Sequence, residues 1–373
     1  MACLWTFKAF FVSSFGILAV PSENSLPSTM QAMQKSFWPC SGPTWRCLAV
    51  NPKAPIPRPQ SGQVLVKMRG SSVNPKDVDC VEPICLLFPL KPSIPFRCSR
   101  GTLGGDSILG GDGSGVVVAA GESCPNLKVG DEVWGFFLGA YAEYAVAPCS
   151  LTRPKPKSLS FIDAGTIPGV GNTAVDIFKR TGAPWKLSDN ITVVVAAGQG
   201  GTGFMAVQVA KAFGASRVIT AATGEGIDLM KSLGVDIVVD YHKQDLFDSL
   251  KNSSVDVVFD NIGVAGTADK AMNAIRPGGT FMLLTGGGKG TLSKHPKAGV
   301  KQIESGIFTP SGDALDVLAA WFDSGTIHAH TFETYNLSAV PEAFTRSQGH
   351  GILGKIAIAP DQTFEFGESS VIV

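Results

Sequence analysis

The chain has 373 residues, of which 44% are hydrophobic, and this length and composition fit a globular protein with two domains. Acidic and basic residues balance at 31 each, and no run of one sign is long enough to follow a phosphate backbone. A small peptide and a disordered chain are excluded, and nucleic acid is not an expected partner.

The first twenty residues combine one lysine with an apolar stretch that ends at Val20, which is the shape of a secretory or organellar leader. An unstructured extension explains the same residues equally well. The apolar stretch is too short to span a bilayer, so no membrane span is expected. We assign 1–29 to a leader or extension outside the fold, and the compartment stays open between cytoplasm and organelle.

Eight cysteines lie at irregular spacings, all of them before residue 150. Disulfide frameworks are typical of small secreted domains, and this chain is much longer. Free and mostly buried thiols are therefore expected. The cysteines are Cys3, Cys40, Cys47, Cys80, Cys85, Cys98, Cys124 and Cys149.

Short β-rich runs separated by Pro- and Gly-rich turns predict an all-β first domain over 30–158. Runs of this kind are Gln63 to Met68 and Gly113 to Ala119. After residue 330 the chain returns to short strands and ends with the run from Lys355 to Ala359. We expect 331–362 to rejoin the first domain and 363–373 to form a tail.

From about Ser160 apolar strands alternate with amphipathic helices, which predicts βαβ units and a parallel sheet over 159–330. Near-continuous apolar strands are expected when helices cover both faces of a sheet. The expected strands are Ile191–Ala197, Arg217–Ala221, Ile237–Asp240, Val255–Asp260 and Thr280–Thr285, followed by a last helix around Asp313 to Asp323. The fold class is therefore α/β, with a doubly wound domain joined to the all-β one.

The most specific local motif is GQGGTG, which directly follows an apolar strand and opens a helix. In this context the first glycine permits a tight turn, the second lets the backbone approach a pyrophosphate, and the last allows close helix packing. The helix N-terminus adds amides and a positive dipole for the anion. We expect a dinucleotide site made by Gly198, Gly200, Gly201, Thr202 and Gly203, and a glycine turn without a ligand is the alternative.

The residue at the end of the next strand distinguishes enzymes that use NADPH from those that use NADH. NAD enzymes place an acidic residue there to bind the ribose hydroxyls. The chain has no carboxylate at this strand end, whereas Thr223 offers a donor to a 2′-phosphate. Lys231 and Tyr241 lie where they can add donors, although a solvated lysine and a packed aromatic ring explain them equally well. NADPH is the expected cofactor, and NADH stays an alternative because Glu225 is close enough to repel a phosphate.

Ten motifs in a fixed order make the chain resemble the medium-chain dehydrogenase/reductase superfamily, of the zinc-independent quinone oxidoreductase or enoyl reductase type. The resemblance covers roughly 30–360 and implies a GroES-like β-barrel domain joined to a Rossmann domain. The motifs are SSVNPKDVD (Ser71–Asp79), GGDGSGVVVAAG (Gly110–Gly121), KVGDEVWGF (Lys128–Phe136), GAYAEYAV (Gly139–Val146), GNTA (Gly171–Ala174), the glycine motif, SLGVDIVVDY (Ser232–Tyr241), VDVVFDNIG (Val255–Gly263), RPGGTF (Arg276–Phe281) and GILGKIAI (Gly351–Ile358).

The resemblance also implies that a catalytic zinc lacks its ligands. Zinc-dependent relatives carry Cys at the position of Asn74 and His at that of Gly111, and they take the third ligand from a region where this chain has no cysteine. Cys80, Cys85 and Cys98 form none of the CxxC pairs that a structural zinc lobe needs. No metal is expected.

By resemblance, Asn74 lies beside the nicotinamide, and Thr173 and Lys355 lie at the cofactor near the cleft between the domains. We add Thr285, at the end of the last strand, to the cofactor set. Ordinary roles are the alternatives: a turn residue for Asn74, a helix cap for Thr173 and an edge-strand lysine for Lys355. Water or Tyr141 is expected to supply the proton.

Without zinc, no Lewis acid polarises an alcohol or carbonyl oxygen, which disfavours alcohol oxidation. The expected reaction is hydride transfer from NADPH to a small electrophilic acceptor, either a quinone or an α,β-unsaturated carbonyl compound. The segment Glu82 to Asp106 is expected to shape the acceptor pocket, with a plain surface loop as the alternative. The competing hypotheses are an NADPH-binding protein with a structural or partner-docking role and a zinc-type alcohol dehydrogenase.

Relatives are commonly homodimers that pair through edge strands of the Rossmann sheet. By this analogy, the run Thr280 to Thr285 is apolar enough to pair two subunits.

Overall fold

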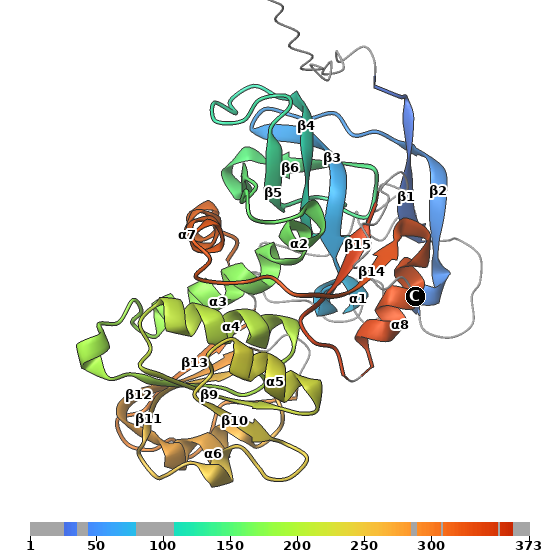
Figure 1. The fold of residues 1–373 in the computed structure, drawn as a ribbon. Coiled ribbons are helices and arrows are strands. Elements are labelled where there is room, and N and C mark those ends of the chain that lie inside the picture. The colour runs from blue at the N-terminus through green and yellow to red at the C-terminus, as the bar shows by residue number, and fades with distance from the viewer. Residues whose placement is uncertain are drawn as a thin grey trace, which may run out of the picture.

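Two sheets and a hairpin organise the part of the chain that the computed structural model describes (Figure 1). The described residues are 26–35, 44–79, 108–284, 289–306, 309–349 and 351–360. Within these ranges, no helix combines the length and the apolar character that crossing a bilayer requires.

The first sheet is fully parallel and has the strand order β10-β9-β8-β11-β12-β13. This is the doubly wound order, and the chain reverses direction across the sheet between β8 and β11, where ligands of such sheets bind. The inner strand β11 is buried along its whole length, whereas the edge strands β10 and β13 are partly exposed. The elements are β8 (Thr192–Val195), α4 (Gly201–Ala212), β9 (Arg217–Ala222), α5 (Glu225–Ser232), β10 (Ile237–Asp240), η6 (Phe247–Ser249), β11 (Val255–Asp260), α6 (Thr267–Ala274), β12 (Ile275–Leu284), β13 (Lys301–Ser305) and α7 (Gly312–Asp323).

The strand β12 lies inside this sheet. It pairs with β11 on one side and with β13 on the other. The expectation that Thr280 to Thr285 forms an edge was therefore wrong, because β13 covers it. In the described part of the chain, the edges of this sheet are β10 and β13.

The second sheet has seven strands in the order β14-β15-β3-β4-β5-β7, with β6 paired to β3. Its strands β14 and β15 come from the C-terminal part of the chain. A separate antiparallel hairpin, β1–β2, precedes it. The elements are β1 (Thr29–Lys35), η2 (Thr44–Cys47), β2 (Leu48–Pro55), β3 (Gln63–Ser72), α1 (Pro75–Asp79), β4 (Asp112–Ala120), β5 (Glu132–Phe136), β6 (Tyr144–Pro148), η4 (Cys149–Leu151), β7 (Thr152–Pro154), β14 (Thr331–Asn336), η7 (Leu337–Ala339), α8 (Val340–Ser347) and β15 (Lys355–Ala359).

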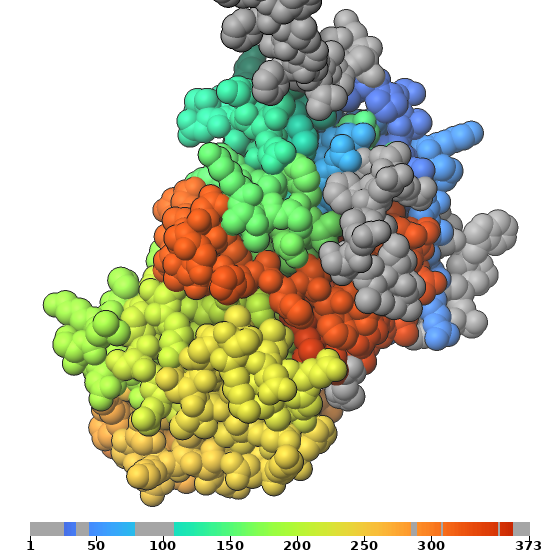
Figure 2. Space-filling view, viewed as in Figure 1, coloured from blue at the N-terminus to red at the C-terminus, as the bar shows by residue number. Residues whose placement is uncertain are grey.

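The helices α2 (Phe161–Thr166) and α3 (Pro168–Arg180) lie between the two sheets, and η5 (Leu187–Asp189) precedes β8. A Cβ on Gly165 would come 2.5 Å from the backbone of Gly70, so α2 packs directly on β3. One apolar core cluster runs from Trp134 of β5 through α3 to Val193 of β8. The two sheets therefore share a core, and in Figure 2 the orange-red C-terminal residues lie between the green and yellow parts of the surface.

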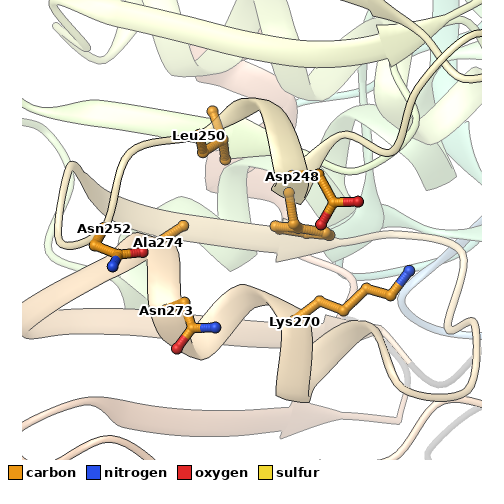
Figure 3. A pocket seen from close by; sticks show the side chains of 7 residues that line it. Asp248, Leu250, Asn252, Lys270, Asn273 and Ala274 are labelled. Atoms are coloured by element: carbon orange, nitrogen blue, oxygen red, sulfur yellow. The ribbon is translucent and has the colours of Figure 1, made fainter.

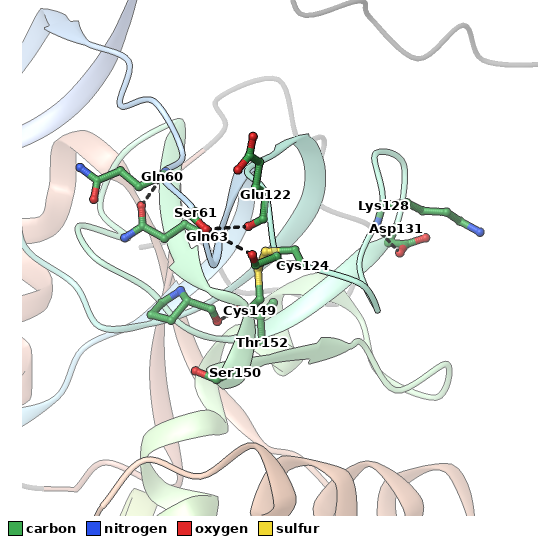
Figure 4. Close-up of a disulfide and its surroundings, with 12 residues drawn as sticks. Gln60, Ser61, Gln63, Glu122, Cys124, Lys128, Asp131, Cys149, Ser150 and Thr152 are labelled. Carbon is green, nitrogen blue, oxygen red and sulfur yellow. Dashed lines mark hydrogen bonds between the residues drawn. A yellow bond between two sulfur atoms is a disulfide. The ribbon is translucent and has the colours of Figure 1, made fainter.

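A disulfide joins Cys124, in the turn after β4, to Cys149, directly after β6 (Figure 4). Both half-buried residues pack against the apolar cluster under these strands. Cys47 is also disulfide-bonded. The expectation of free thiols was wrong for these cysteines. Because β4 and β6 both pair with β3, two cysteines 25 residues apart are brought together, and sequence spacing does not reveal this.

Candidate functional site

The glycine motif forms the connection between β8 and α4, as predicted. Gly200 is the extended residue before the helix, and no side chain caps the first amides of α4, so they point outward where an anion can accept from them. A Cβ on Gly203 would overlap the carbonyl oxygen of Ala197, whereas a Cβ on Gly200 would meet nothing within 4 Å. Gly203 is thus required for packing, and Gly200 leaves open space beside the backbone.

Side chains and backbone of neighbouring strands hold this loop in place. The amide of Asn261, which follows β11, accepts from the N–H of Ala197 at 3.0 Å and donates to its carbonyl oxygen at 2.9 Å. The N–H of Gly198 donates to Ala221 at 3.0 Å. Sequence reasoning missed Asn261, because only the sheet order places it beside the glycine motif.

The segment that leads into β15 lies directly against the glycine loop. The N–H of Gly354 donates to the carbonyl oxygen of Gln199 at 2.8 Å, and Gly354 forms a bridge with Gly200. A Cβ on Gly201 would come 2.5 Å from Cδ of Lys355. The dinucleotide loop and the returning C-terminal strand therefore form one wall of the site.

Lys355 connects this wall to Asn74. Its ammonium donates to the carbonyl oxygen of Val73 at 2.6 Å and to Oδ1 of Asn74 at 2.8 Å. The other end of the Asn74 amide donates from Nδ2 to the Asp112 carboxylate at 2.9 Å. The edge-strand alternative for Lys355 was wrong, because β15 lies between β14 and β3 and the residue is buried.

Buried charges surround Asn74. Burial lowers the pKa of Lys355 to about 8, while the carboxylates of Asp112 and Asp77 act in the opposite direction. Burial likewise raises the pKa of Asp77. One oxygen of Asp112, Oδ1, is buried without a hydrogen-bond partner among the described residues. The sequence gives no direct sign of the part played by Asp77 or Asp112, because only the fold brings the two carboxylates together beside Asn74.

The hydroxyl of Tyr141 donates to the carbonyl oxygen of Ser72 and to Oδ2 of Asp77, at 3.0 and 3.1 Å. Burial, and then the charge of Asp77, raise the pKa of Tyr141 well above its ordinary value. The side chain is fully buried. This placement favours a structural role in holding Asp77 and gives no support to the prediction that Tyr141 supplies the proton.

Thr173 lies in the middle of α3, where its hydroxyl donates to the carbonyl oxygen of Gly169 at 2.7 Å. The helix-cap alternative was therefore wrong, because α3 begins at Pro168. A Cβ on Gly169 would come 2.8 Å from Oδ2 of Asp112, so the first turn of α3 packs against the carboxylate that binds Asn74. Thr173 lies one helical turn beyond that contact.

Thr223 follows β9 at the far end of the glycine loop. Its N–H donates to Oε1 of Gln199 at 2.7 Å, and its hydroxyl donates to Oδ1 of Asp240 at 3.0 Å. The backbone N–H of His242 is the main cause that lowers the pKa of Asp240. A charged carboxylate thus lies beside Thr223. Sequence reasoning missed it, because Asp240 ends the neighbouring strand β10.

Two further predicted cofactor ligands lie on the surface near Thr223. The Lys231 side chain is 64% exposed and lies 3.9 Å from Asp228. Tyr241 is exposed, and its ring lies 4.7 Å from that of His242. The packed-ring alternative for Tyr241 is therefore wrong, and both side chains are accessible to a ligand. Thr285 and the segment Glu82 to Asp106 lie outside the described residues.

Two surface hollows lie apart from these residues. The hollow drawn in Figure 3 is formed around η6 and α6, by Phe247, Asp248, Leu250, Asn252, Lys270, Asn273 and Ala274. Another lies beside the disulfide and includes Arg153 and Asp316. Neither contains a residue of the glycine motif. In the described ranges, no group of three or more His, Cys, Asp or Glu side chains is arranged to hold a metal ion.

Two family models match the chain. "Alcohol dehydrogenase GroES-like domain" matches residues 60–157, and "Zinc-binding dehydrogenase" matches residues 201–308. The first matched range covers β3 to β7, and the second begins at the glycine loop and extends beyond β13. The expected GroES-like domain and Rossmann sheet are thereby confirmed.

Several known proteins are similar to the chain over most of its length. An NADPH-dependent alkenal/one oxidoreductase of Arabidopsis thaliana chloroplasts is 29% identical over 82% of this chain and 74% of its own. The mitochondrial NAD(P)H oxidoreductase RTN4IP1 of Danio rerio is 31% identical over 80% and 84%. A solved mycobacterial quinone oxidoreductase is 25% identical and superposes with a TM-score of 0.70, covering 89% of this chain and 100% of that one.

Proposed function

Because the chain belongs to the medium-chain dehydrogenase/reductase superfamily, we propose that it uses NADPH to reduce a quinone or an α,β-unsaturated carbonyl compound without zinc. The chain is an oxidoreductase, as its relatives are. The acceptor class follows the names of the alkenal/one and quinone oxidoreductases.

The contact of Lys355 with both the glycine loop and Asn74 carries this proposal. The open backbone at Gly200 and the uncapped start of α4 suit a pyrophosphate. Asn74 lies at the other end of the Lys355 side chain, and Asp112 fixes its amide. A bound NADPH supplies hydride; the residues of this chain bind it, orient it and limit access of water.

The donor groups near Asn74 support a reaction without zinc. Both ends of the Asn74 amide are used, by Lys355 and by Asp112. At Gly111 the ammonium of Lys76 occupies the neighbouring space, since a Cβ there would come 2.9 Å from Nζ. An ammonium group and an amide bound by a lysine do not suit a divalent cation, whose ligands are anionic or neutral lone-pair donors.

NADPH is proposed over NADH for two reasons. The exposed side chains of Lys231 and Tyr241 offer donors to a 2′-phosphate, and the Arabidopsis relative is named as NADPH-dependent. The Thr223 hydroxyl adds a donor only if it turns away from Asp240. Asp240 acts against this choice, since its carboxylate would repel the phosphate. Lys243 lies 3.4 Å from that carboxylate and reduces the repulsion.

The proposed reaction is tested by following NADPH consumption by the purified chain. A quinone and a 2-alkenal serve as acceptors, with NADH run in parallel and zinc measured directly in the same sample. Turnover with NADPH and no stoichiometric zinc is the expected result. NADPH binding without consumption of any conjugated acceptor would instead favour the structural or partner-docking role.

We also propose a homodimer, now through β13 in place of Thr280 to Thr285. In the described ranges β12 is the strand that pairs with β13, so the outer edge of β13 can pair with a second copy. Light scattering with the full chain measures the mass directly, and a monomer at high concentration would exclude the pairing.

A further inference from the structure

Lys76 lies on α1, two residues after Asn74, and is half-buried. A Cβ on Gly111 would come 2.9 Å from Nζ of Lys76 and 3.4 Å from its Cε, so the ammonium lies over the backbone of Gly111. The next residue, Asp112, accepts from the Asn74 amide. Lys76 therefore lies close to Asn74, beside which the resemblance places the nicotinamide and hence the acceptor of its hydride.

A second ammonium, that of Lys355, lies near the first, and the charge of Lys76 is one of the causes that lower the pKa of Lys355. Two carboxylates lie among these ammonium groups: burial raises the pKa of Asp77, and the charge of Lys76 acts against this rise. Asp77 accepts from Tyr141 and from the N–H of Asn74, and Asp112 accepts from Ser72 and from the Asn74 amide. Two ammonium groups and two carboxylates thus lie around Asn74. An ammonium carries three N–H groups, so Lys76 can donate to a ligand oxygen in addition to its neighbours in the protein.

We propose that Lys76 binds the carbonyl oxygen of the acceptor and stabilises the negative charge that this oxygen gains. The inference rests on the proposed function and names one more residue of that site. It does not depend on whether the acceptor is an enal, an enone or a quinone, since in each case the carbonyl oxygen becomes anionic. For the test we use the α,β-unsaturated carbonyl.

The reaction balances as follows for that acceptor. The β-carbon receives hydride, with its electron pair, from the dihydronicotinamide. The carbon–carbon π pair moves to join the α-carbon and the carbonyl carbon, and the carbonyl π pair moves to oxygen. Lys76 donates an N–H to this enolate oxygen, and the α-carbon then takes a proton from water. NADPH, one proton and the unsaturated carbonyl give NADP⁺ and the saturated carbonyl.

Gly111 provides the space that Lys76 occupies. Any side chain at residue 111 would push against the end of the lysine. The backbone of Gly111 is not in the left-handed region, so alanine is compatible with its conformation. Gly111→Ala is therefore expected to keep the fold and to displace the ammonium without removing its charge.

The experiment compares four variants of the full chain. Lys76→Met removes the charge and keeps the length of the side chain, Lys76→Arg keeps a charge, and Gly111→Ala moves the charge. Lys128→Met, at an exposed turn of the same domain, is the matched control. We measure kcat/KM for a 2-alkenal, the Kd of NADPH and the thermal midpoint of each variant.

We expect Lys76→Met to lower kcat/KM by roughly a hundredfold, as loss of one donor to a developing oxyanion does, with the NADPH Kd unchanged. Lys76→Arg should recover part of the loss, Gly111→Ala should lie in between, and Lys128→Met should match the wild type. If Lys76→Met keeps kcat/KM, or loses NADPH affinity to the same extent, the role of Lys76 is wrong while the proposed function stands. A wild type inactive with every conjugated acceptor overturns both.

Discussion

The ammonium of Lys355 lies 2.8 Å from Oδ1 of Asn74, although 281 residues separate them in the chain. The contact forms because β15 returns from the C-terminal part to pair with β3, two residues before Asn74. The same lysine packs against Gly201 of the dinucleotide loop. The candidate site therefore depends on three distant segments, and changes in any of them should alter cofactor binding.

Gly200 and Gly203 of the loop should respond differently to alanine. Gly200→Ala adds a Cβ that meets no protein atom, so the thermal midpoint should stay unchanged while NADPH binds about tenfold or more weakly, the loss expected for one hydrogen bond to phosphate. Gly203→Ala forces a Cβ onto the Ala197 carbonyl and should cost at least about 2 kcal/mol of unfolding free energy. Urea unfolding and NADPH fluorescence measure both. Equal NADPH affinity in Gly200→Ala and wild type would contradict this use of the loop.

Because of Lys355, the free energy of unfolding should rise with pH in the alkaline range. Its pKa is about 8 in the folded chain and 10.5 ordinarily, so between these values the unfolded chain binds more protons and stability rises with pH. Lys355→Met lacks this titration. The wild type should gain up to about 3 kcal/mol of unfolding free energy relative to Lys355→Met from pH 8 to pH 10.5. Urea unfolding across that range measures the difference, with Lys128→Met, at an exposed turn, as control. If the free energy of unfolding varies with pH in the same way in the wild type and in Lys355→Met, the lowered pKa of Lys355 is wrong.

Asp240→Asn should shift the chain further toward NADPH. The substitution removes the negative charge beside Thr223, and the amide oxygen can still accept from its hydroxyl. The ratio of kcat/KM for NADPH to that for NADH should rise several-fold, because the 2′-phosphate no longer meets a carboxylate. Lys231→Met should lower the same ratio. Steady-state kinetics with both cofactors decide the matter, and an unchanged ratio in both variants would place the 2′-hydroxyl or its phosphate elsewhere.

Loss of the Cys124–Cys149 disulfide should destabilise the first domain. The bond closes a loop of 25 residues, and loops of this length contribute about 3 kcal/mol. The double variant Cys124→Ser, Cys149→Ser should unfold at a correspondingly lower urea concentration. Reduction of this disulfide should lower the urea midpoint of the wild type and cannot do so in the double variant. Thiol counting on the unfolded chain provides the control. If the oxidised wild type has two more free thiols than the double variant, the bond between Cys124 and Cys149 is absent.

The sequence alone determined the class of fold and the dinucleotide loop. Burial of both faces of a parallel sheet requires apolar strands that alternate with helical segments, and this leaves a pattern in the sequence. The glycine spacing reflects the local backbone conformation of the loop, so it too can be recognised from the sequence. The strand ends and α7 were accordingly predicted to within a few residues. The return of the last strands to the first domain was predicted from the short β-like runs after residue 330, and β14 and β15 lie in the sheet of that domain.

Only the tertiary structure decided which side chains meet. Asp112 reaches Asn74, Asp240 reaches Thr223 and Lys76 reaches Gly111 because strands and turns distant in sequence are neighbours in the sheets. The pairing of Cys124 with Cys149 and the covering of β12 by β13 have the same origin. Such contacts are fixed by the order of strands and by packing, neither of which leaves a periodic pattern in the sequence.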